Sequence, residues 1–189
     1  GQKVASTFFI LRYLLLLLCF FIASCRTAGQ SGGNPAANGR GAGRVEEAEV
    51  RGNSLNPLLN DGDSVKIYYG FYDTHEVQRG DIVVCRFSFR QDPVIKIVRA
   101  VPADRFELKD LEDGGALLLI NGSELKNSSG RLYKFSGKRK QMLSLYAKDY
   151  KGVIPENSYL LLGNLTEGSL DSSRFGLVDR EVIIGKAAR

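Results

Sequence analysis

Short apolar runs separated by turn residues fill the chain from Val45 onward, and this pattern predicts β-strands. The runs are rich in β-branched and aromatic residues and are bounded by Gly, Pro, Asn and Asp, which is typical of strands. The pair Asn121-Gly122 follows an apolar run and predicts a tight hairpin. The predicted strands are residues 64–69, 81–87, 94–101, 116–120, 158–162 and 181–184.

Helical periodicity is confined to residues 141–150. The tight basic run Lys138-Arg139-Lys140 lies just before this segment, and such a run is typical of a solvated loop. We therefore predict an all-β domain of short, coiled strands over residues 46–189. No internal repeat interrupts it.

The N-terminal part has a different pattern. Residues 1–6 are a short polar segment with one positive charge, and residues 7–25 are almost entirely apolar except for Arg12. A helix of about 20 residues spans a bilayer, so residues 7–25 predict an N-terminal apolar helix that anchors the protein in a membrane. Alternatively they are a lipoprotein signal sequence, because Ile22-Ala23-Ser24-Cys25 is similar to a lipobox, in which the cysteine (here Cys25) becomes lipidated. Either alternative holds the folded domain at a membrane.

Composition limits the kinds of partner and bound group that the chain is expected to have. Residues 26–45 are rich in Gly, Ala, Asn and Ser and predict a flexible linker. The net charge of +5 is modest, and no basic helix or zinc spacing is present, so nucleic acid is not a predicted partner. The 3 cysteines form no disulfide framework and no Cys/His cluster, and we expect no metal ion and no cofactor.

Residues 51–59 carry a candidate nucleophile. Ser54 lies two residues after a glycine and three before a proline. Gly52 admits backbone angles closed to other residues and allows another chain to approach. Pro57 disfavours helix at the preceding residue, so we expect an extended segment. Ser54 is then either a presented nucleophile or an ordinary turn serine.

A nucleophilic Ser54 would need a base to accept its proton. The chain has 1 histidine, His75, which we expect in an exposed loop. Lys96 lies inside the apolar strand 94–101, where alternation places it on the same face as Val94 and Val98. Burial would lower the pKa of Lys96 and let the neutral amine take a proton from a serine hydroxyl. On an edge strand its head group would instead reach water.

Six segments in order along the chain resemble motifs of the type I signal peptidases, also called leader peptidases. One alone is a weak signal, but six in the same order indicate the family. The segments are residues 52–59 around Ser54, Gly-Asp-Ile-Val-Val at 80–84, residues 96–104 from Lys96, Ile-Asn-Gly at 120–122, residues 154–164, and residues 169–176.

The resemblance implies a membrane-bound serine endopeptidase that removes signal peptides from exported preproteins. Ser54 would be the nucleophile and a neutral Lys96 the general base. Ser169 would hydrogen-bond and orient the Lys96 amine, and Asp171 would support this part of the site. The substrate and oxyanion region would comprise Gly52, Asn53, Leu55 and Pro57.

The resemblance also implies a fold and partners. The fold would consist of coiled antiparallel sheets forming a partly open barrel, with a reduced accessory β region at residues 105–150. The partners would be a lipid bilayer and preproteins with small residues before the cleavage site. The catalytic domain would lie on the extracytoplasmic face of the cell membrane.

The chain departs from the family motifs at several positions. Asn164 and Leu165 stand for the usual Asp-Asn pair, Ser173 for the arginine after Asp-Ser, Ile97 for the arginine after the base, and Gly52 for a frequent oxyanion-donor serine. These departures keep two alternatives open. One is a peptidase of the same family that matures pilin or conjugation proteins, and the other is a catalytically impaired, membrane-tethered binding module.

Overall fold

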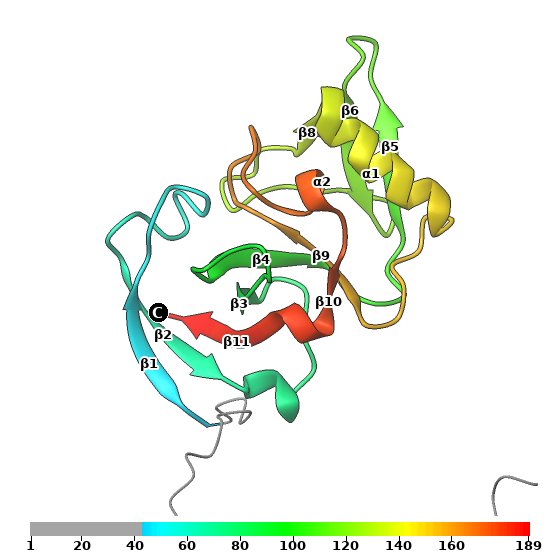
Figure 1. Cartoon of the computed structure of the whole chain (residues 1–189). Helices are drawn as coiled ribbons and strands as arrows, with labels where there is room; N and C mark the ends of the chain where they lie inside the picture. The colour runs from blue at the N-terminus through cyan, green and yellow to red at the C-terminus, as the bar shows by residue number, and fades with distance from the viewer. Residues whose placement is uncertain (1–42) are drawn as a thin grey trace, which may run out of the picture. The chain divides into compact units, whose positions relative to one another are not determined.

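The computed structural model describes residues 43–189, which form two antiparallel β-sheets with a small helical component (Figure 1). The apolar segment 7–25, with Cys25, lies outside the described residues. The larger sheet is built, in spatial order, from β1 (Val45–Glu49), β2 (Ser64–Tyr69), β11 (Ile183–Ala188), β3 (Ile82–Cys85), β4 (Val94–Ala100), β9 (Ser158–Leu162) and β10 (Val178–Asp179).

The second sheet and the longer helix lie between β4 and β9 in the sequence. The sheet consists of β5 (Phe106–Asp110), β6 (Ala116–Ile120), β7 (Ser123–Glu124) and β8 (Lys134–Phe135). Helix α1 (Gly137–Asp149) lies beside β5 and β6 at one end of the molecule in Figure 1, and buried Leu143 joins the core there. The short helices are η1 (Phe71–Asp73), α2 (Ser172–Phe175) and η2 (Arg180–Val182).

Side-chain alternation explains how the central strands pack. In β3, Val83 and Cys85 join one buried cluster, while Val84, on the opposite face, joins the cluster beneath residues 51–59. In β9, Tyr159 and Leu161 pack into the first of these clusters, and Leu160 packs toward the second sheet. Strands buried on both faces read as continuous apolar runs, which is the pattern of these two segments.

Several predictions of the fold are confirmed. The described domain is mainly β and antiparallel throughout. Asn121 (φ 51°) and Gly122 (φ 78°) form a two-residue turn that pairs Ile120 with Ser123, as a tight hairpin requires. The large sheet runs from β1 to β10 without pairing between these two strands, so the described domain contains no closed barrel.

Other boundaries were predicted wrongly. The strand expected at 181–184 is the turn of η2 followed by β11, because a continuous apolar run does not distinguish a helical turn from a strand. Val45, assigned to the linker, is already in β1 and pairs with Tyr68. Residues 105–150 contain the 13-residue helix α1 in addition to strands. Within residues 43–189 no helix combines the length and apolarity needed to cross a membrane.

Candidate active site

The Ser54 loop (residues 51–59) is a set of turns and not the extended segment that was predicted. The Asn56 N–H donates to Asn53 O (3.0 Å) and the Leu59 N–H donates to Leu55 O (3.1 Å). Leu55 and Leu59 are each 1 % exposed and share one core cluster. Because these leucines are four residues apart, a helical turn is needed to bury both, and this outweighs the extended preference before Pro57.

Lys96 meets Ser54 inside the domain. Its amine Nζ lies 3.1 Å from Ser54 Oγ and donates to the Ile95 carbonyl at 2.8 Å. Lys96 is only 4 % exposed, and its amine lies against the Ser54 loop and the Ile95 carbonyl. The alternative of an edge-strand lysine that reaches water is therefore wrong.

Burial controls the protonation of this amine. Desolvation lowers the pKa of Lys96 below its ordinary value, while the negative charge of Asp171 opposes the shift, as does Cys85 to a smaller extent. Arg90, in the loop between β3 and β4, lowers the Lys96 pKa further. A lysine that loses its proton more easily is better suited to accept one from a serine hydroxyl.

Asp171 organises the segment that follows β9. Its carboxylate is 1 % exposed and accepts hydrogen bonds from the Ser169 hydroxyl (2.6 Å), the Ser173 hydroxyl (2.6 Å), the Ser173 N–H (3.0 Å) and the Gly163 N–H (3.1 Å). Ser169 thus faces Asp171, and the Lys96 amine has Ser54 and Ile95 as its hydrogen-bond partners within residues 43–189. The predicted direct bond from Ser169 to the Lys96 amine is not formed.

Gly163 and Asn164 hold the Ser54 loop against the end of β9. The Asn164 N–H donates to Ser54 O at 2.7 Å, and its side-chain amide donates to Asn56 O at 3.0 Å. A Cβ on Gly163 would lie 2.7 Å from Ser54 O and would also overlap the Ser169 hydroxyl. The backbone carrying Ser54 therefore requires glycine at 163.

Two arginines reach positions where the chain departs from the family motifs: Arg99, within the motif segment 96–104, and Arg139, outside all six segments. Arg99 donates from Nη2 to Asn164 Oδ1 at 3.3 Å. Arg139, predicted in a solvated loop, lies in α1 and donates from Nε to Ser173 Oγ at 2.8 Å. Sequence reasoning missed both contacts. The arginine missing at position 173 was a hint that another cation was needed, but nothing local indicated which one.

A groove of about 440 Å³ opens in front of Ser54 and Lys96. Its walls come from two strands that have a free edge there. Strand β1 pairs only with β2, and in β4 the pairing with β9 begins at Ile97, so Val94 to Lys96 pair on one side only. The groove is lined by residues of both edges and of the Ser54 loop, among them Glu46, Ala48, Val50, Ser54, Ile95 and Lys96.

The other predicted site residues fall as follows. Gly52 (φ 86°) is exposed and its N–H donates to Asp61 at 2.6 Å, while Asn53 and Pro57 are exposed beside Ser54 and Leu55 is in the core. His75 is exposed in its loop, as predicted, and stacks on Phe71 with ring centroids 4.1 Å apart.

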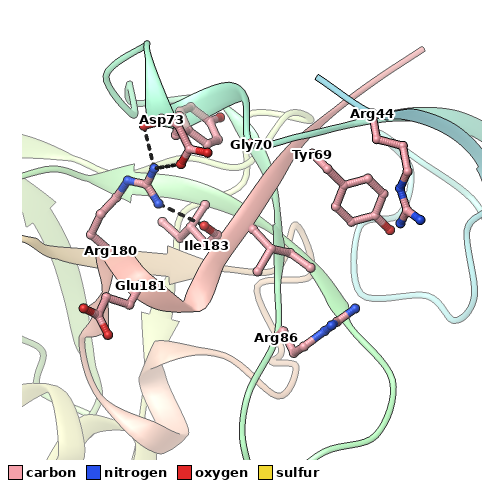
Figure 2. Close-up of a pocket in the computed structure, with 10 residues that line it drawn as sticks. Arg44, Tyr69, Gly70, Asp73, Arg86, Arg180, Glu181 and Ile183 are labelled. Atoms are coloured by element: carbon pink, nitrogen blue, oxygen red, sulfur yellow. Dashed lines mark hydrogen bonds and ion pairs between the residues drawn. The ribbon is translucent and has the colours of Figure 1, made fainter. Parts of the chain in front are cut away.

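A second cavity, of about 290 Å³, lies where β2, η1 and β11 meet. Figure 2 shows the Arg180 guanidinium between Asp73 and the Ile183 carbonyl, to which it donates at 2.9 Å. It also donates to the Tyr72 carbonyl at 2.5 Å. Arg180 thus ties η1 to the start of β11, which is a structural role, and this cavity contains neither Ser54 nor Lys96.

Comparisons with known proteins agree with the sequence motifs. Residues 42–189 match the sequence model of the family described as signal peptidase, peptidase S26. A signal peptidase IB of Staphylococcus aureus is 31 % identical over 148 residues, covering 74 % of this chain and 73 % of the relative. A signal peptidase I of Bacillus licheniformis is 28 % identical over 141 residues, covering 72 % and 70 %.

A solved structure, that of a signal peptidase I from Enterococcus faecalis, aligns with 59 % of this chain and 97 % of its own at 23 % identity and a TM-score of 0.43. The sequence matches define the class of the protein as a hydrolase, a serine endopeptidase. Within that class, the chain belongs to the signal peptidase family, peptidase S26.

Proposed function

We propose that this protein is a membrane-bound endopeptidase that removes signal peptides from exported preproteins, with Ser54 as nucleophile and Lys96 as general base. The observation that carries the proposal is the 3.1 Å approach of Lys96 Nζ to Ser54 Oγ, at an amine that is 4 % exposed and faces the groove. Family membership supports the substrate class.

The groove suits an extended substrate. A peptide entering between β1 and residues 94–96 would find unpaired backbone N–H and C=O groups on both sides, which is how an added strand is recognised. Such pairing would hold the scissile carbonyl in register with Ser54. Small side chains before the cleavage site are proposed from the family resemblance.

The reaction would proceed by acyl transfer. The neutral Lys96 amine takes the proton from Ser54 Oγ as this oxygen attacks the scissile carbonyl, and the resulting ammonium gives that proton to the departing amine. The neutral amine then deprotonates a water molecule that hydrolyses the acyl-enzyme. Within residues 43–189 the Ser54 N–H donates no hydrogen bond to the protein, so it is available to the oxyanion, and such a donor is typically worth about 2.7–4 kcal/mol.

Ser169 and Asp171 would support the dyad, and Gly52, Asn53, Leu55 and Pro57 would shape the loop that presents Ser54. Asp171 accepts hydrogen bonds from the Gly163 N–H and the Ser169 hydroxyl. The residue after Gly163, Asn164, donates its N–H to the Ser54 carbonyl, so Asp171 supports the backbone that carries Ser54. Residues 7–25 would hold the domain on the extracytoplasmic face of the membrane, by an apolar helix or by a lipid on Cys25.

The test is cleavage of a preprotein by the purified full chain in detergent. We expect a single cut after an Ala-x-Ala sequence, mapped by mass spectrometry of both products. A matched preprotein with Ala-x-Phe at the same place should remain intact. A folded wild-type chain that cleaves neither preprotein would contradict the proposal and favour a binding module.

A further inference from the structure

Arg139 occupies an unfavourable place for a cation in its own helix. It lies in the first turn of α1, which contains no acidic residue, and the positive end of the helix dipole repels a cation there. Its guanidinium instead reaches the segment between β9 and α2, where Nη1 donates to the Glu167 carbonyl at 2.8 Å. It also lies over the Phe135 ring, 4.6 Å from the centroid.

The surroundings of Arg139 are shaped to admit it. The guanidinium packs directly against Gly168 (φ 123°), where a Cβ would lie 2.7 Å from Arg139 Nη1. Among residues 43–189, the Nη2 atom is buried without a hydrogen-bond partner. A buried polar atom without a partner needs an explanation, and the contacts of Arg139 outside its own helix offer one.

A chain of hydrogen bonds, with one covalent step from Gly163 to Asn164, leads from Arg139 to the backbone that carries Ser54. Arg139 Nε donates to Ser173 Oγ (2.8 Å), and Ser173 Oγ donates to Asp171 Oδ1 (2.6 Å). The other carboxylate oxygen, Asp171 Oδ2, holds Gly163 (3.1 Å). Asn164, the residue after Gly163, donates its N–H to the Ser54 carbonyl oxygen (2.7 Å). Helices α1 and α2, which carry Arg139 and Ser173, lie next to each other (Figure 1).

We propose that Arg139 is a positioning residue for peptide-bond cleavage: through Ser173 it orients Asp171 and balances its charge, and so it sets the geometry and protonation of the Ser54–Lys96 pair. This inference rests on the proposed function. It assigns to an arginine of α1, 34 residues away in sequence from its contact, a task in the active site.

The charges around Lys96 and Arg139 predict the direction in which loss of Arg139 would shift the Lys96 pKa. Three groups around Lys96 affect its pKa: Asp171 in the segment before α2, Cys85 in β3 and Arg90 in the β3–β4 loop. Burial lowers the Lys96 pKa, and the charge of Asp171 raises it. Around Arg139, burial lowers the pKa of its guanidinium, and Asp171 and Glu167 oppose this while Arg174 of α2 adds to it.

Removing the Arg139 charge leaves Asp171 uncompensated, and its effect on Lys96 increases. The fraction of neutral Lys96 at a given pH then falls, so the rising limb of activity moves to higher pH. For partly screened charges, we expect a shift of about half a pH unit.

The experiment compares the pH dependence of kcat/KM for Arg139→Gln, Arg139→Lys and Lys138→Gln in the full chain in detergent. Lys138 is the exposed neighbour in the same basic run, so Lys138→Gln removes an equal charge without the contact. We expect an alkaline shift and a lower kcat for Arg139→Gln, partial recovery for Arg139→Lys, and wild-type behaviour for Lys138→Gln. A folded Arg139→Gln variant that matches Lys138→Gln overturns the inference.

Ser173→Ala provides a second route if Arg139→Gln fails to fold. This variant keeps the arginine but removes the relaying hydroxyl, and it must lower kcat. A folded Ser173→Ala variant with wild-type kcat overturns the inference.

The titration of Lys96 is also read directly, from the pH dependence of its acylation by a small anhydride followed by peptide mass mapping. If the wild type cleaves no preprotein but the acylation midpoint still moves in Arg139→Gln, the proposed function fails and the effect of Arg139 on Lys96 stands. If the wild type cleaves and both readouts stay unchanged in Arg139→Gln, the inference alone fails.

Discussion

At the scale of single residues, the proposed chemistry depends on the protonation of Lys96. A lysine 4 % exposed, beside a serine hydroxyl and within the influence of one buried carboxylate, is subject to opposing effects on its pKa. Burial is the largest of them and lowers the pKa. The amine can then be neutral at a pH where an exposed lysine is charged.

The first prediction concerns the pH dependence of activity. In the proposed mechanism the neutral amine is the active form. Because its pKa is lowered from 10.5, kcat/KM should rise with pH and level off below pH 10.5. Lys96→Arg keeps the positive charge but cannot lose its proton, and we expect a loss of about 10²–10⁴-fold. Initial rates on a preprotein across pH measure both effects. A flat profile, or an active Lys96→Arg variant, would remove Lys96 from the mechanism.

The second prediction concerns stability and needs no substrate. The folded pKa of Lys96 lies below the unfolded one, so between the two the unfolded chain binds more protons and wild-type stability rises with pH. Lys96→Met has no such term. Its free energy of unfolding relative to the wild type should therefore fall as pH rises toward 10.5, as followed by urea denaturation. If the difference in unfolding free energy between Lys96→Met and the wild type is constant with pH, burial does not lower the pKa of Lys96.

At the scale of elements, the segment after β9 joins three parts of the fold. Asn164, which is fully buried, contacts the Ser54 loop through Asn56 O and the second-sheet region through Ser128, and it accepts from Arg99. An amide both donates and accepts, which a carboxylate at this position would not do. Asn164 therefore suits the partners that surround it in this chain.

The third prediction tests this junction. Asn164→Ala removes the partly buried side-chain hydrogen bonds to Asn56 O and from the Ser128 N–H, and a buried polar group left unpaired costs about 1–3 kcal/mol. The free energy of unfolding should fall by at least that amount, together with activity, because the Ser54 loop loses its support. Gln141→Ala, an exposed position on α1, serves as the control and should change little. Equal stability of the two variants would refute the role of Asn164.

The strands were predictable because alternation and turn residues are local signals. The Asn121-Gly122 hairpin, β4 with Lys96, and β9 follow from them. The start of α1 at Gly137 was not, since the basic residues there carry no apolar repeat. The contact from Arg99 to Asn164 was not predictable either, because it joins residues 65 apart in sequence. Local patterns place a residue on an element, but only the packed fold selects its partner.

At the scale of the whole molecule, the proposed function requires the residues before position 43 to hold the folded domain at the membrane. The fourth prediction is that the full chain sediments with membranes after a high-salt wash, whereas a chain of residues 43–189 does not. Hydrophobic insertion resists salt, unlike attraction to charged lipid head groups. Release of the full chain by salt would contradict the anchor.

The same membrane fractions distinguish a lipid anchor on Cys25 from an apolar helical anchor. Metabolic labelling with a lipid precursor should mark the wild type and not Cys25→Ala if Cys25 is lipidated. An unlabelled wild type that still sediments with membranes would leave the apolar helix at residues 7–25 as the anchor.

The central claim, that Ser54 and Lys96 act as one catalytic unit, is tested most directly by a double-mutant cycle on preprotein cleavage. Ser54→Ala and Lys96→Met should each lower kcat/KM by at least about 10³-fold, and the double variant should be no slower than either, because members of a catalytic unit are strongly non-additive. An active Ser54→Ala variant, or a double variant whose loss equals the product of the single losses, would contradict the account.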